Sequence, residues 1–115
     1  MSETKPITAT GQLSKFNKYI FNPTSANGKD VLFTRLGYSI QDSDTLLRIY
    51  LQQAAIKYST GEYTLGKLGE YGQKIYIDIE IPGVGDAAGQ SAIYKSVWMI
   101  DPDGSIRLVT PFGGK

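Results

Sequence analysis

The chain has 115 residues, a length that suits one compact domain able to bury a core without disulfides. It contains no histidine and no cysteine, which excludes thiol nucleophiles, zinc sites built on these residues, and imidazole acid–base catalysis. The formal net charge of +1 gives no strong overall attraction to polyanions, so a basic surface would have to be local. Lys, Arg, Tyr, Ser, Thr and carboxylates must therefore carry any chemistry.

The start of the chain is polar and has no apolar signal-peptide core, so we expect residues 1–12 to be a flexible leader. One domain is expected over residues 13–115. No apolar stretch approaches the ~20 residues that a membrane-spanning helix needs, so no membrane anchor is expected.

Three helices are predicted in the first half of the domain. Residues 13–21 place apolar side chains on one helical stripe, and the turn-forming residues 22–28 follow. Lys29 then begins a second short helix that closes at Gly37, although a cation is unfavourable for the dipole at a helix start. The main helix is predicted over residues 44–58, after several possible N-caps.

The main helix is expected to bury one face and to expose the other. Its apolar face consists of Leu47, Tyr50, Leu51, Ala54 and Tyr58. On the opposite face we expect Arg48, Gln52 and Gln53 to meet water.

The second half of the chain has the period of two that is typical of strands. Residues 74–81 alternate without error, with four isoleucines on one face and polar residues on the other. The polar face consists of Lys74, Tyr76, Asp78 and Glu80. Further strands are predicted at 62–67, 91–100 and 105–110, and the pattern predicts an α+β fold with N-terminal helices packed on an antiparallel sheet of about four strands.

The last two strands are expected to form a hairpin around the sequence Asp-Pro-Asp-Gly at 101–104. A type I turn with a left-handed Gly104 pairs Met99 with Arg107 and Lys95 with Pro111, which places Lys95 and Arg107 on one face. The other face is then expected to carry Tyr94, Ser96, Trp98, Leu108 and Thr110. A tighter turn would move this assignment by one position.

Two segments that resemble ligand sites have simpler interpretations. The glycine-rich residues 83–89 lack the Gly-Lys-Ser/Thr ending or following helix that phosphate binding requires, so we interpret them as a hairpin loop. Residues 101–104 contain two carboxylates, which is few for a calcium site, and a β-turn accounts for every residue of this segment. We therefore expect neither a metal nor a cofactor.

The polar face of residues 74–81 could be an ordinary solvated surface, which is the simpler explanation for a single strand. Neighbouring strands add Lys95, Arg107 and Thr110. Cations, a phenol and a hydroxyl on one open sheet are what a phosphodiester site needs, because Arg clamps phosphate through two N–H groups and cations stabilise the charged pentacoordinate state.

Short, spaced matches give the chain a resemblance to a known group of toxins. The matching residues are Asn22-Pro23, Gly28-Lys29, Phe33, Leu36-Gly37-Tyr38, Tyr71-Gly72-x-Lys74-x-Tyr76, Val97-Trp98-x-Ile100 and Arg107-Leu-Val-Thr110. They resemble the small C-terminal domains of the barnase, EndoU, colicin and RelE ribonuclease group, which end bacterial polymorphic toxins and contact-dependent growth inhibition effectors.

The resemblance implies a ribonuclease that cleaves RNA, often tRNA, on the open face of its sheet. It implies delivery as part of a larger secreted or cell-surface effector, action in the cytoplasm of the target cell, and a cognate immunity protein as partner. Carried over by position, it singles out Lys29, Lys74, Tyr76, Arg107 and Thr110. Some members use histidine as the base, so the histidine-free members that rely on Lys, Arg and Tyr are the better analogue here.

In the expected mechanism the ribose 2′-oxygen attacks the adjacent phosphorus without a metal ion. Arg107 and Lys74 would neutralise the phosphate, Thr110 would donate a hydrogen bond to it, and Tyr76 or Lys29 would move protons. The alternative is a non-enzymatic protein-binding module, such as an immunity or adaptor protein. Eight tyrosines suit either function, because tyrosine buries large area at modest entropic cost and also stacks on bases.

Overall fold

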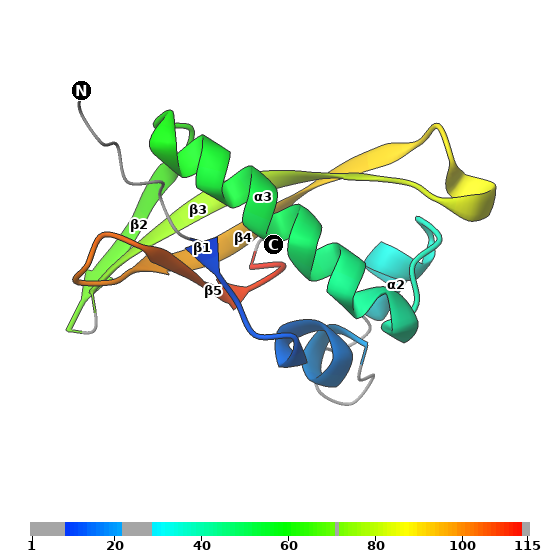
Figure 1. Ribbon diagram of the computed structural model, residues 1–115, viewed down its shortest axis with the longest axis horizontal. Coiled ribbons are helices and arrows are strands. Elements are labelled where there is room, and N and C mark those ends of the chain that lie inside the picture. The colour runs from blue at the N-terminus through cyan, green and yellow to red at the C-terminus, as the bar shows by residue number, and fades with distance from the viewer. Residues whose placement is uncertain (1–8, 22–28, 71, 114–115) are drawn as a thin grey trace, which may run out of the picture.

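The computed structural model describes residues 9–21, 29–70 and 72–113 (Figure 1). The elements in chain order are β1 (Ala9–Thr10), the π-helical turn η1 (Lys15–Ile20), α2 (Asp30–Thr34), the 3₁₀ turn η2 (Ile40–Asp42), α3 (Ser43–Ser59), β2 (Thr64–Gly69), β3 (Gly72–Pro82), the 3₁₀ turn η3 (Gly85–Ala87), β4 (Ser91–Ile100) and β5 (Ile106–Thr110). The predicted α+β class is confirmed, with one long helix packed on a five-stranded, mostly antiparallel sheet. The turn expected at 22–28 lies outside the described residues.

The strand order is β1-β5-β4-β3-β2, and only β1 pairs in parallel. Ala9–Thr10 were expected within a flexible leader, and in this the expectation was wrong. The backbone of β1 pairs with Ile106 and Arg107, and so covers an edge of β5 that would otherwise be unpaired. It also makes the sheet five strands instead of four. No helix in the described part of the chain is long and apolar enough to cross a membrane.

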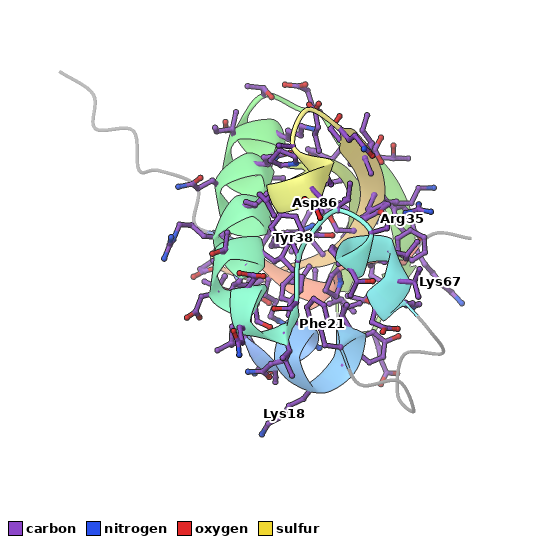
Figure 2. The ribbon with its side chains drawn as sticks, turned by 90° about the vertical axis from the view of Figure 1, so that its right-hand side faces the viewer. Lys18, Phe21, Arg35, Tyr38, Lys67 and Asp86 are labelled. Atoms are coloured by element: carbon purple, nitrogen blue, oxygen red, sulfur yellow. The ribbon has the colours of Figure 1, made fainter. Side chains whose placement is uncertain are left out.

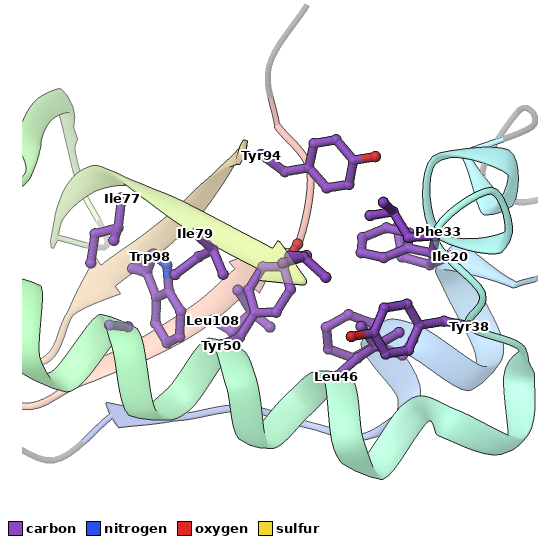
Figure 3. Close-up of a cluster of buried hydrophobic side chains, with 14 of the residues drawn as sticks. Ile20, Phe33, Tyr38, Leu46, Tyr50, Ile77, Ile79, Tyr94, Trp98 and Leu108 are labelled. Carbon is purple, nitrogen blue, oxygen red and sulfur yellow. The ribbon is translucent and has the colours of Figure 1, made fainter. Parts of the chain in front are cut away.

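The core lies between α3 and one face of the sheet (Figure 3). The four isoleucines of β3 are fully buried, as their alternation predicts, and Trp98 of β4 packs with them. The buried stripe of α3 differs from the expected one: Leu46 is fully buried, and Leu47 is only partly buried. The stripe runs through Ser43, Leu46, Tyr50 and Ala54, a spacing of three or four residues that faces the sheet.

Three tyrosines tie distant segments of the backbone together across this core. The Tyr50 hydroxyl donates to the Pro111 carbonyl over 2.9 Å, and the Tyr94 hydroxyl donates to the Leu32 carbonyl. Burial raises the pKa of Tyr50 well above its usual value, so the phenol stays protonated and keeps donating. The Tyr38 hydroxyl donates in the same way to the end of β3. These bonds anchor the C-terminal residues and α2 to the core.

The β4–β5 hairpin has the predicted turn, but its register changes beyond it. Gly104 has a φ of 90° and Met99 pairs with Arg107, as expected. A bulge then pairs Val97 with Thr110, so the expected pairing of Lys95 with Pro111 was wrong. Because the bulge inserts one residue, it moves Thr110 onto the same sheet face as Arg107, opposite to the face expected from the sequence.

The helix α3 also closes a gap along the sheet edge. Strand β2 pairs with β3 only as far as Tyr76, which leaves the far end of β3 as a free edge. Gln53 accepts a hydrogen bond from the Glu80 N–H (2.8 Å) and donates one to the Glu80 carbonyl (2.6 Å), while Lys57 donates to the Asp78 carbonyl (2.5 Å). Gln53, expected to meet water, therefore takes the place of a neighbouring strand.

Replacing Gln53 should weaken the fold more than replacing its neighbour. The Gln53→Ala variant loses both bonds to Glu80, and we expect it to lower the free energy of unfolding by about 1 kcal/mol. The control is Gln52→Ala, an exposed change on the same helix that should stay within about 0.5 kcal/mol. Urea denaturation measures both, and equal stability of the two variants would contradict the role given to Gln53.

Candidate functional site

Polar residues of β3, β4 and β5 lie on the sheet face that α3 does not cover, which we call the outer face. Two rows of paired residues cross it. One row consists of Lys74, Met99 and Arg107, and the next consists of Tyr76, Val97 and Thr110. Asp78 and Lys95 pair in the row beyond. In Figure 2 the helix lies on one side of the sheet and Lys67, from the neighbouring strand β2, points away from it.

The outer face has an apolar floor and a polar rim. Val97 and Met99 in the middle strand are buried, with 7% of each exposed, although they point away from α3. Lys95 and Arg107 are exposed around them. Two strand spacings, about 9.5 Å, separate the Lys74 and Arg107 backbones, so their long side chains can converge above Met99.

Arg107 is positioned by one carboxylate. Its Nε donates to Asp101 Oδ1 over 3.0 Å, and half of the side chain remains exposed. A surface pair of this kind contributes little to stability, about 0–1 kcal/mol, but it fixes the orientation of the guanidinium. The two terminal nitrogens make no other hydrogen bond to a described residue, so they can form a fork toward an anion.

The Tyr76 ring packs against Gly66 of the neighbouring strand β2. A Cβ added to Gly66 would lie 2.8 Å from the ring atom Cε2, so the absence of a side chain there gives the ring its place. Lys95 Nζ lies 5.4 Å from the ring centroid on the outer face. A hollow of about 540 Å³ begins beside the ring, and Lys57, Glu62, Asp78 and Lys95 are among its lining residues.

Lys29 lies apart from these rows, in a second hollow of about 500 Å³ that we call the lysine cavity. Its lining residues are Ser14, Lys15, Lys18, Tyr19, Lys29, Val109, Thr110, Phe112 and Gly113. Lys29 Nζ donates to the Tyr19 hydroxyl (3.0 Å) and the Phe112 carbonyl (3.1 Å), and it lies within 6 Å of both ring centroids. These contacts offset the unfavourable position at the start of α2, where Lys29 was expected and is found.

The structure brings four of the five predicted residues together. Lys74, Tyr76, Arg107 and Thr110 share the outer face in adjacent rows, whereas Lys29 lies beyond Thr110 in the lysine cavity. Thr110 connects the two, because it belongs to a row of the outer face and also lines the cavity. Its hydroxyl donates a long hydrogen bond of 3.4 Å to the Phe112 carbonyl, the same oxygen that Lys29 contacts.

Sequence reasoning missed part of this arrangement. Lys15 and Lys18 share a helical face by their spacing of three, and this was the available signal for the cavity. The roles of Asp101, Gly66 and Phe112 depend on a turn, a strand contact and a chain reversal, which have no local signature. Within the described ranges, no group of three or more acidic side chains lies close enough to hold a metal ion.

The chain belongs to a family described as Domain of unknown function (DUF6883), whose model matches residues 7–115. The match spans nearly the whole chain, including every residue of the outer face and of the lysine cavity. Comparison with the curated proteins gave no match, and comparison with the solved structures gave none.

The position of Tyr76 should depend on Gly66. In the Gly66→Ala variant the new methyl group would overlap the ring, so we expect the ring to swing away from its place under Lys95. Proton NMR should then show the Lys95 side-chain signals losing their ring-current shift. Gly69→Ala is the matched control, because a Cβ there meets no atom within 4 Å. Unchanged Lys95 signals in Gly66→Ala would contradict this packing.

Proposed function

We propose that this protein is a ribonuclease domain that cleaves RNA, with tRNA as the expected substrate, on the outer face of its sheet and without a metal ion. The observation that carries the proposal is the convergence of Lys74, Tyr76, Arg107 and Thr110 on two adjacent rows of one open sheet face. Two cations, a phenol and a hydroxyl in this arrangement match the needs of phosphodiester cleavage.

The reaction is an attack by the ribose 2′-oxygen on the adjacent phosphorus. The new P–O2′ bond forms as the P–O5′ bond breaks, one proton leaves the 2′-hydroxyl and another reaches the 5′-oxygen. The products are a 2′,3′-cyclic phosphate and a 5′-hydroxyl. Charge develops on the non-bridging oxygens, which is where preorganised cations and donors contribute most to the rate.

The positions of the side chains suggest a role for each. The free terminal nitrogens of Arg107 clamp the phosphate, Lys74 approaches the same point from two strands away, and Thr110 donates from the next row. Tyr76 lies on the same face as these groups and moves the proton. Lys29 suits this task less, because two of its three N–H groups already bind Tyr19 and Phe112. The buried Val97 and Met99 give the nucleotide an apolar floor.

The binding-module alternative rested on the tyrosines, and the structure reduces its support. Tyr38, Tyr50 and Tyr94 are buried and each donates its hydroxyl to a backbone carbonyl. Tyr58 and Tyr63 pack against each other at the end of α3. Tyr71 lies outside the described residues. Tyr76 alone among the described tyrosines therefore lies within the outer-face rows.

The proposal includes a biological setting. The domain would be delivered as part of a larger secreted or cell-surface effector, would act in the cytoplasm of a target cell, and would be neutralised by a cognate immunity protein. An immunity protein that covers the outer face would have to present carboxylates to Lys74, Lys95 and Arg107, because complementary charge favours association.

The chemistry predicts a specific product. Purified protein incubated with total tRNA in EDTA should yield fragments with 2′,3′-cyclic phosphate ends, which can be detected because their 3′ ends resist ligation until the phosphate is opened and removed to leave a 3′-hydroxyl. Products with 3′-hydroxyl ends, or cleavage that requires added magnesium, would refute the mechanism. Intact tRNA, together with tight capture of a single protein partner, would favour the binding module.

Arg107 gives the sharpest test of the site. Arg107→Lys keeps the charge but loses the two-point fork, so we expect at least about a hundredfold loss of cleavage with little change in melting temperature. Arg48→Lys is the matched control, because Arg48 is exposed on α3 and lies away from the outer face. Full activity of Arg107→Lys and of Arg107→Ala would remove Arg107 from the site.

A further inference from the structure

The lysine cavity collects positive charge from side chains of η1 and from the start of α2. Lys15, Lys18 and Lys29 line it, and none of its described lining residues is acidic. Lys15 and Lys18 make no side-chain hydrogen bond or ion pair with another described residue. Three ammonium groups around one hollow repel one another, and a bound anion would relieve that repulsion.

A structural role explains one of these lysines and leaves the other two unexplained. Lys29 holds the C-terminal residues by its bond to the Phe112 carbonyl, and the rings of Tyr19 and Phe112 flank its ammonium. Lys15 and Lys18 take no part in that contact. They come from η1, a π-helical turn in which the Phe21 N–H donates to the Phe16 carbonyl five residues back. Such turns are rare in proteins as a whole, and many of those that occur lie at functional sites.

The donors of the cavity suit phosphate. Lysine ammonium groups act as point charges for phosphate oxygens, and the hydroxyls of Ser14 and Thr110 add neutral donors on the same wall. Lys29 already has two fixed partners, so its remaining N–H can be directed at a ligand with little further loss of side-chain entropy.

The lysine cavity begins at Thr110, one row along the sheet from Arg107, so the two are separate places for a phosphate. Arg107 and Thr110 are three residues apart along β5, which is about 7–10 Å once the bulge is allowed for. Two phosphates of one strand could occupy both places, and Thr110 lies between them. A ligand with a single phosphate could occupy one place only.

We propose that the lysine cavity binds a phosphate that neighbours the one at Arg107, so that the substrate is a strand of RNA with at least two phosphates and not a mononucleotide. This inference rests on the proposed function for the identity of the strand. The cavity gives the strand its register on the outer face, and Thr110 contacts the backbone between the two phosphates.

The test measures binding without cleavage. The probe is a fluorescein-labelled, single-stranded deoxyribonucleotide hexamer, which lacks the 2′-hydroxyl and cannot be cut by the proposed reaction. Its dissociation constant is measured by anisotropy at several salt concentrations. Each phosphate contact contributes about 0.7 to the slope of log K against log salt for a single strand. The Lys15→Gln/Lys18→Gln double variant should therefore lower the magnitude of the slope by about 0.7, the contribution of the one phosphate in the cavity.

The matched control is Arg48→Gln combined with Arg35→Gln, which removes the same charge from exposed positions outside the cavity and should leave the slope within about 0.3 of the wild-type value. Circular dichroism checks that the variants fold. Lys29→Gln is a secondary variant, because it also releases Phe112. An unchanged slope in the lysine double variant would overturn the proposal, as would an equal loss in the arginine control.

Two further outcomes separate the possible explanations. Saturable binding of inorganic phosphate, combined with an unchanged hexamer slope, would overturn the proposal in favour of a free-anion site. Cleavage of tRNA with an unchanged slope would refute the cavity alone. A lysine-dependent slope without any tRNA cleavage would support the cavity and refute only the proposed chemistry.

Discussion

The alternation of β3 is the constraint on which the rest of the structure depends. Ile75, Ile77, Ile79 and Ile81 are all fully buried in the core that α3 and Trp98 share. A strand has a period of two, so burying these residues forces the residues between them outward. A slip of one residue would expose four isoleucines, and the core therefore holds the outer face in register. The strand β3 therefore supplies both core residues that stabilise the fold and polar residues of the candidate site.

Other features protect that strand from its own free edge. Beyond Tyr76 no described strand pairs with β3 on the side of β2, and the side chains of Gln53 and Lys57 bond to its backbone there instead. This arrangement lets β3 extend past β2 without leaving its own outer backbone groups as an open edge. Helix α3 thus acts twice, as the cover of the core and as a substitute for an edge strand.

Elements that neighbouring residues specify could be predicted from the sequence. Features that depend on contacts between distant segments could not. The α3 helix, the β3 alternation and the Asp101–Gly104 turn were predicted because each is specified by neighbouring residues. The bulge that moves Thr110 to the outer face has no such signal, since strand pairing decides it. The same is true of β1, a two-residue strand whose partner lies near the other end of the chain. Lys74, Tyr76 and Arg107 could be grouped because β3 and the hairpin turn set most of the face, whereas Thr110 reaches that face only through the bulge.

Lys29 shows how a locally unfavourable residue can mark a site. A cation at the start of α2 opposes the helix dipole, and neither the short helix nor its cap requires it. It is kept in place by Tyr19 and by the Phe112 carbonyl, partners from η1 and from the C-terminal residues. A residue that is unfavourable for its own local structure is expected at positions where function, and not folding, selects the residue. The same reasoning covers Lys15 and Lys18, which line this cavity with no acidic side chain among its described lining residues.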